Sequence, residues 1–174
     1  MKKRNTNIYS NETVSIDCLE DEKFSRQLFS MMNHQVEILK SESFILKQME
    51  LKGIDTFSKA LVYVMDELND PRITKEYLAK FIGVSTKTIQ NYRNDKTIPD
   101  TIERVMLICL GCRTGPEVSK FLINKGIGGI PDSGFKKIAY ELLLKYTDTS
   151  LEFWNMILDE FDLPYIYPKE KRGK

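Results

Sequence analysis

Amide, hydroxyl and lysine side chains recur between Thr86 and Asn94, in a stretch that contains no carboxylate. A side-chain amide can donate and accept at once, as an adenine edge requires, and a lysine can donate to the acceptors of guanine. At helical spacing, Ile89 and Tyr92 would face inward and leave the polar side chains outside. The residues predicted to contact base edges are Thr86, Lys87, Gln90, Asn91 and Asn94.

A second set of polar residues in the same region is better suited to hold phosphates. From Pro71 to Arg104 the chain has seven basic and four acidic residues, although its overall net charge is only +1. Basic charge gathered in one segment favours a polyanion, and phosphate contacts fix the register of a protein on a duplex. The residues predicted to contact phosphates are Lys75, Ser85, Arg93 and Lys96.

Two short helices and a tight turn are needed to present these side chains. Thr74 can cap a helix through Phe81, Gly83 can adopt the positive φ of a turn, and Ser85 can cap a helix through Tyr92. A small residue must lie where the helices cross, and apolar residues must anchor both of them. The residues predicted to form the core of this motif are Leu78, Ala79, Gly83, Val84, Ile89 and Tyr92.

The stretch from Ile73 to Pro99 resembles the phage-repressor-like (Cro-type, xenobiotic-response) helix-turn-helix family. The matching positions are Thr74, Leu78, Ala79, Gly83, Val84, Ser85, Thr88, Ile89 and Pro99. The chain departs from the family pattern at Lys75, where Gln is common, at Tyr92, where Trp is usual, and at Arg93, where Glu is usual. The resemblance implies a bacterial or phage protein whose second motif helix enters the major groove.

Helical periodicity covers most of the remaining chain, so we predict an all-α fold. The resemblance makes this a lambda-repressor-like helix-turn-helix bundle with extra N-terminal and C-terminal helices. The predicted parts are a mostly helical N-terminal extension at 1–55, the helix-turn-helix domain at 56–111, a C-terminal helical bundle at 112–166 and a basic tail at 167–174. The exception is Val14–Cys18, where alternating apolar and polar residues are compatible with a short strand.

Capping residues locate the ends of the other helices. Asp100 with Glu103, and Thr149 with Glu152, have the spacing of capping boxes. The predicted helices outside the motif cover 21–52, 56–68, 100–110, 115–126, 133–146 and 149–163. One face of the helix at 133–146 is predicted to be apolar through Phe135, Ala139, Leu142 and Tyr146.

Other residues give little reason to expect catalysis or a metal. Cys109 and Cys112 have the spacing of half a zinc site, but only Cys18 and His34 remain as further ligands. The sequence shows no clustered carboxylates and no pairing of a nucleophile with a base. We therefore expect no enzyme, no metal and no cofactor, and we expect the cysteines to be ordinary core residues.

Together these features predict a sequence-specific DNA-binding transcriptional regulator that acts as a repressor. Double-stranded DNA is the expected partner, and a homodimer is expected because one helix-turn-helix contacts few bases. The alternative is a protein-interaction module, such as an antitoxin, that binds a partner through its N-terminal or C-terminal helices. A cytoplasmic protein without a membrane partner is expected, because no apolar run approaches the roughly 20 residues of a membrane span.

Overall fold

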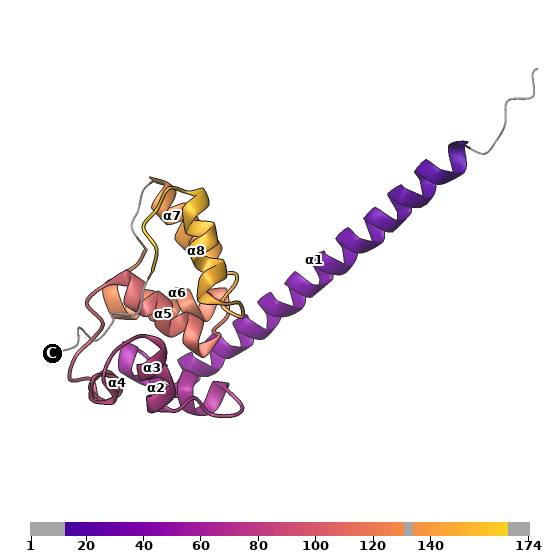
Figure 1. The fold of residues 1–174 in the computed structure, drawn as a ribbon. Coiled ribbons are helices and arrows are strands. Elements are labelled where there is room, and N and C mark those ends of the chain that lie inside the picture. Colours follow the sequence, from indigo (N-terminus) through magenta and orange to yellow (C-terminus); the bar gives the residue numbers. More distant parts are fainter. Residues whose placement is uncertain (1–12, 131–133, 167–174) are drawn as a thin grey trace, which may run out of the picture. The chain divides into compact units, whose positions relative to one another are not determined.

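A computed structural model describes residues 13–130 and 134–166, and all regular structure within them is helical (Figure 1). The all-α prediction is therefore confirmed. The elements in chain order are α1 (Thr13–Leu51), α2 (Phe57–Tyr63), the π-helical η1 (Val64–Leu68), α3 (Lys75–Phe81), α4 (Thr86–Arg93), α5 (Ile102–Cys112), α6 (Pro116–Ile127), α7 (Gly134–Leu143) and α8 (Leu151–Glu160). The predicted basic tail and the predicted helix start at Ser133 lie outside the described residues. None of the described helices combines the length and apolar character needed to cross a membrane.

The chain divides into two units, Met1–Ser41 and Glu42–Lys174. The boundary falls within α1, so the last part of this helix belongs to the second unit. In the first unit, the side chains that the structure describes between Arg26 and Ser41 are all exposed. The division into an extension, a DNA-binding domain and a C-terminal bundle stays a prediction.

The strand considered at Val14–Cys18 is wrong, because these residues belong to α1. Alternation over five residues is a short signal, whereas a long helical pattern follows it directly. Once a helix has formed, each added residue contributes another hydrogen bond without a new nucleation cost. Extending α1 to Thr13 is therefore favoured over starting a strand that has no neighbouring strand among the described residues.

The hydrophobic core lies in the second unit and extends from Met49 to Ile166. It joins α2 to α4 and α6, α3 to α4 and α5, α5 to α6, and α7 to α8. The ring of Phe57 packs edge-on against Tyr92, with centroids 6.3 Å apart. Trp154 is fully buried, and its indole N–H donates to the carbonyl of Tyr146 at 2.9 Å. This core holds α2, α3 and α4 in fixed positions.

Several predicted helix ends are wrong: α1 begins at Thr13 rather than Asp21, α5 ends at Cys112 rather than Leu110, α7 ends at Leu143 rather than Tyr146, and α8 ends at Glu160 rather than Leu163. Three predicted capping positions are also displaced by one or two residues. The cap of α5 is Thr101, whose hydroxyl accepts from the Arg104 N–H, while Asp100 forms an ion pair with the Arg104 guanidinium. The cap of α8 is Ser150 rather than Thr149. Helix α6 passes Gly126 and ends at Ile127, with Gly128 in the left-handed conformation. In each case a neighbouring residue can make the same terminal hydrogen bond, so spacing alone does not choose between them.

The apolar face predicted for α7 is also partly wrong. Ala139 is buried, but Phe135 and Tyr146 are exposed. The buried side of this segment is formed by Ala139 with Tyr140, Leu143 and Leu144. Tyr140 and Lys136 both donate to the Glu103 carboxylate of α5, and these long-range bonds fix the rotation of α7.

A buried carboxylate connects the part of α1 in the second unit to the start of α6. Glu42 Oε1 accepts the backbone N–H of Glu117 at 3.0 Å, and Oε2 is buried without a hydrogen-bond partner. Desolvation raises the pKa of the Glu42 carboxyl, and the backbone hydrogen bonds only partly oppose it. A side chain on Gly115 would collide with Oε1, so this contact requires glycine there.

Candidate nucleic-acid interface

The predicted motif consists of α3, a turn and α4, each fixed by local hydrogen bonds. Thr74 Oγ1 accepts the Tyr77 N–H, and Ser85 Oγ accepts the Thr88 N–H, both at 3.1 Å. Both predicted caps are therefore confirmed. Gly83 has φ +69°, as predicted for the turn, a conformation that costs little only for a residue without Cβ.

The residues predicted to form the motif core lie between the helices or beside them. Leu78, Ala79, Ile89 and Tyr92 are buried, whereas Gly83 and Val84 are half-buried. Because Ile89 and Tyr92 lie three residues apart on α4, their burial fixes which face of this helix is turned toward the core. The polar residues on the other side of α4 therefore face solvent.

Two further contacts hold the C-terminal end of α4 in place. The Ser58 hydroxyl donates to the carbonyl of Arg93 at 2.6 Å. The Arg93 guanidinium donates two hydrogen bonds to the Asp66 carboxylate of η1, at 2.9 and 2.6 Å. The hydrogen bond from Arg93 lowers the pKa of the Asp66 carboxyl, against the effect of desolvation. Ser58 and Asp66 could not be identified from the sequence, because no local pattern indicates partners that lie 35 and 27 residues away from Arg93.

The residues predicted to contact bases share the solvent side of α4. Thr86, Lys87 and Asn94 are exposed, and Gln90 and Asn91 are half-buried. The Gln90 amide is held at both ends: Lys75 Nζ donates to its Oε1, and its Nε2 donates to Asn94 Oδ1, each at 2.8 Å. The amide thus has a defined orientation, and its N–H₂ and its oxygen each retain hydrogen-bonding capacity.

The residues predicted to contact phosphates have different surroundings. Lys96 is exposed, and so is Ser85, although its hydroxyl caps α4 and also bonds to the Thr88 hydroxyl. Lys75 donates a hydrogen bond to Gln90, one of the residues predicted to contact bases, and Arg93 is already paired with Asp66. Their predicted roles at phosphates stay predictions.

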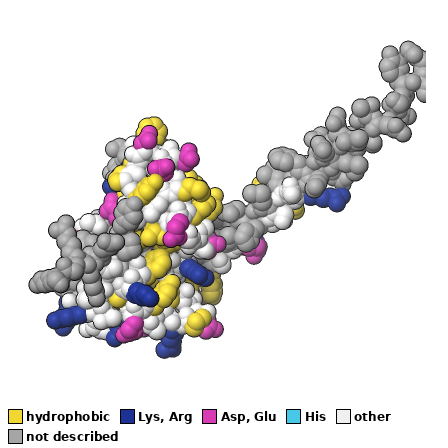
Figure 2. Space-filling view, viewed as in Figure 1, with side chains coloured by type: hydrophobic (Ala, Val, Ile, Leu, Met, Phe, Trp, Pro, Cys, Tyr) yellow, Lys and Arg dark blue, Asp and Glu magenta, His cyan; other side chains and the backbone are white. Residues whose placement is uncertain are grey.

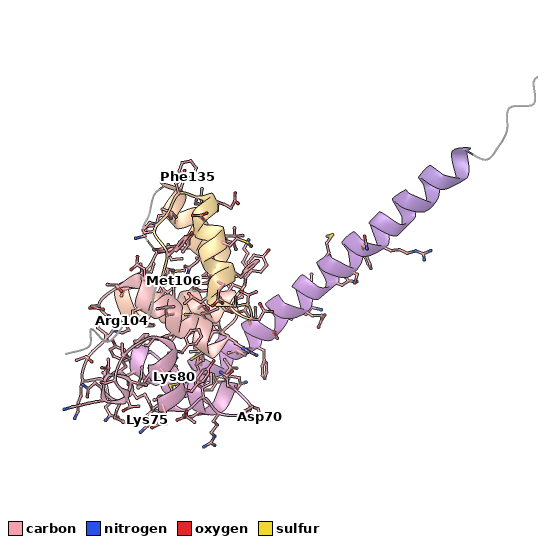
Figure 3. The ribbon with its side chains drawn as sticks, in the orientation of Figure 1. Asp70, Lys75, Lys80, Arg104, Met106 and Phe135 are labelled. Carbon is pink, nitrogen blue, oxygen red and sulfur yellow. The ribbon has the colours of Figure 1, made fainter. Side chains whose placement is uncertain are left out.

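Basic side chains beyond the predicted set lie in the same region. Arg72 and Lys80 are exposed, and Lys75 and Lys80 both project from α3 (Figure 3). Most of the Lys and Arg side chains visible on the second unit lie over its lower part in Figure 2, where α2, α3 and α4 are found. Acidic side chains are prominent over α7 and α8, at the other end of the same face. On this face of the second unit, basic and acidic side chains therefore gather at opposite ends.

The described residues contain no group of three or more His, Cys, Asp or Glu side chains arranged to hold a metal ion. Cys109 and Cys112 are free and buried. Burial raises the pKa of the Cys109 thiol to about 11, and it also raises the pKa of the Cys112 thiol. The side chains of Cys18 and His34 lie outside the described ones.

Comparison with known proteins adds no relative. No family model, no curated protein and no solved structure matches this chain. The resemblance to the phage-repressor-like family therefore stays a prediction based on the residues between Ile73 and Pro99.

Proposed function

We propose that the chain is a sequence-specific DNA-binding regulator in which α3 and α4 act as a helix-turn-helix. The proposal rests on one observation above the others. The solvent side of α4 presents Thr86, Lys87, Gln90, Asn91 and Asn94 together, while its other side is buried and pinned by Asp66 and Ser58. A rigid helix with amides and a lysine on its open face suits the acceptors and donors of the major groove.

In this proposal α4 enters the major groove by its N-terminal end. Lys87 donates to guanine, and Gln90 pairs with adenine through its oxygen and nitrogen together. The Lys75–Gln90–Asn94 hydrogen bonds hold the amide before DNA arrives, which lowers the entropy lost on binding. Exposed Arg72, Lys80 and Lys96 supply charge to phosphates, and Arg93 serves to position α4. A regulator bound in this way represses transcription by occupying the operator.

The first test is binding of the full chain to random-sequence duplex DNA, followed by fluorescence polarisation at several salt concentrations. Affinity is expected to fall steeply with salt, because each phosphate contact releases counterions. On a preferred sequence selected from the random pool, replacing Lys87 and Gln90 together by alanine is expected to weaken binding by about ten-fold or more, since a good contact to the right base contributes roughly 1–3 kcal/mol of discrimination.

A matched control is the double variant Lys145→Ala/Asn124→Ala, which removes one lysine and one amide from exposed positions outside the motif. It is expected to bind like wild type. Equal loss of affinity in both double variants would mean that the motif is not the DNA-binding surface. Absence of wild-type binding at low salt would reject the proposal.

A protein-interaction module is the second candidate, and exposed apolar side chains on α7 favour it. Phe135 is 72% exposed and Ile138 is 55% exposed, one helical turn apart. Phe135 lies at the far end of the second unit from Lys75 (Figure 3). Such a module would tolerate Gln90→Ala and Asn91→Ala but lose partner binding on Phe135→Ser, so the two sets of variants separate the candidates.

A further inference from the structure

The part of α1 in the first unit has an apolar stripe that no described residue covers. Phe29 is 66% exposed, Met32 58% and Val36 46%. At about 100° per residue, these three side chains lie within an arc of about 60° on the helix. We call them the α1 stripe. An isolated helix in water gains little stability from propensity alone, so an uncovered stripe indicates a missing partner.

We propose that the α1 stripe pairs with the same stripe of a second copy of this chain, with the two helices antiparallel. A two-fold interface must be self-complementary, because residue i meets residue j while j meets i. The α1 stripe satisfies this condition. A two-fold axis that passes near Met32 places Phe29 of one copy opposite Val36 of the other. Met32 of one copy then lies next to Met32 of the other. The same apolar side chains thus cover one another.

The charges along this part of the helix favour the antiparallel direction. The sequence of α1 before the stripe contains a run of acidic residues, namely Asp17, Glu20, Asp21 and Glu22. A parallel copy in register would bring this acidic segment of the sequence beside its own counterpart, which is repulsive. With the axis near Met32, an antiparallel copy instead brings exposed Lys40 within about one helical turn of the level of Glu22, and Glu42, which lies at that level too, is buried and accepts the Glu117 N–H. The acidic runs of the two copies then lie apart.

The pairing is independent of what α3 and α4 bind, because it is a property of the free protein. It also serves the proposed function, since two copies can occupy two half-sites and one helix-turn-helix contacts few bases. The failure of either proposal can therefore be recognised separately. Solution mass tests the pairing without DNA, and DNA titration tests the interface of α3 and α4.

The test is analytical ultracentrifugation of the full chain at tens of micromolar, comparing wild type with Phe29→Glu/Met32→Glu. Wild type is expected at twice the chain mass of 20.3 kDa and the variant at 20.3 kDa. The control is Gln27→Glu/Ser30→Glu, which adds the same charge to exposed positions away from the stripe and is expected to remain a dimer. Circular dichroism and the melting temperature check that the second unit stays folded in all three proteins.

A monomeric wild type overturns the pairing, and so does a stripe variant that dimerises as well as wild type. The direction is tested by spin labels on Lys40→Cys in a Cys18→Ser background, with Cys109 and Cys112 buried. Antiparallel helices place the two labelled positions on the order of 20–30 Å apart, and parallel helices place them about 10–15 Å apart. The shorter distance would overturn the antiparallel arrangement.

Discussion

Replacing Asp66 by asparagine is expected to loosen the C-terminal end of α4 while leaving the size of the side chain unchanged. The variant removes the negative charge of the carboxylate and replaces one of the two oxygens that accept hydrogen bonds from Arg93 with an N–H₂ group. The Arg93 and Asp66 side chains are only 19% and 32% exposed, so solvent screens their interaction incompletely. Charge-assisted hydrogen bonds contribute about 1.5–3 kcal/mol when buried, and exposed ion pairs contribute about 0–1 kcal/mol. For this intermediate pair we expect a loss of about 1–2.5 kcal/mol.

The assay is thermal and urea unfolding of Asp66→Asn beside Asp100→Asn. Asp100 also pairs with an arginine, but its side chain is 59% exposed, so this control should lose no more than about 0.5 kcal/mol. For a chain of this size, the expected loss at Asp66 corresponds to a fall in melting temperature of about 3–8 °C. Equal effects of the two substitutions would refute the assignment of Asp66 as an anchor of α4.

The same pair has a defined dependence on pH. Because Arg93 lowers the pKa of Asp66 in the folded state, the stabilisation is complete above the ordinary aspartate pKa of about 3.9. It is lost as the pH falls further, through the lowered folded-state pKa. The difference in stability between wild type and Asp66→Asn should therefore be constant from pH 7 to about pH 5 and shrink in more acidic solution. A difference that does not change with acidity would contradict this reasoning.

Three further predictions follow from Glu42 and the buried cysteines. Gly115→Ala should destabilise the fold by about 1–3 kcal/mol, because the added Cβ collides with the Glu42 carboxylate. Glu42→Ala should remove most of that cost in a double-mutant cycle measured by urea unfolding. Additive effects of the two substitutions would contradict the contact. The pKa of the Glu42 carboxyl is raised in the folded state. Wild type should therefore gain stability relative to Glu42→Gln as the pH falls through this raised pKa toward the ordinary glutamate pKa of about 4.3. A difference in unfolding free energy that does not change with pH would contradict the raised pKa. Cys109 and Cys112 should resist iodoacetamide at pH 8 in the native protein and react after unfolding in urea, as followed by peptide mass mapping; rapid native labelling would show that they are accessible.

Local signals in the sequence predicted the local structure of the motif. Thr74 and Ser85 each bond to a backbone N–H three residues away, and Gly83 adopts its turn conformation without distant help. Such features depend on a few neighbouring residues, so their residue types and spacing suffice. The same approach misplaced the caps at Thr101 and Ser150, because an adjacent residue could make an equivalent bond.

Contacts between distant segments could not be predicted from spacing. Glu42 meets Glu117 across 75 residues, and Arg93 meets Asp66 across 27. The rotation of α7 likewise depends on the bonds from Lys136 and Tyr140 to Glu103, over 33 and 37 residues. These pairs form only after the helices have packed, and nothing in the local sequence of either partner identifies the other. The residues proposed to contact bases could be chosen from the sequence, but the hydrogen bond between Lys75 and Gln90 is visible only in the folded structure.

Recognition of DNA bases by α4 is tested most directly by selecting preferred sites from a random duplex library with wild type, Gln90→Ala and Lys96→Ala. Gln90→Ala is expected to relax the preference at one base position, at a cost of about 1–3 kcal/mol there. Lys96→Ala is expected to weaken all sites alike and to reduce the salt dependence by about one phosphate contact. Unchanged base preference in Gln90→Ala, or failure of wild type to enrich any site at low salt, would contradict the proposal that α4 contacts DNA bases.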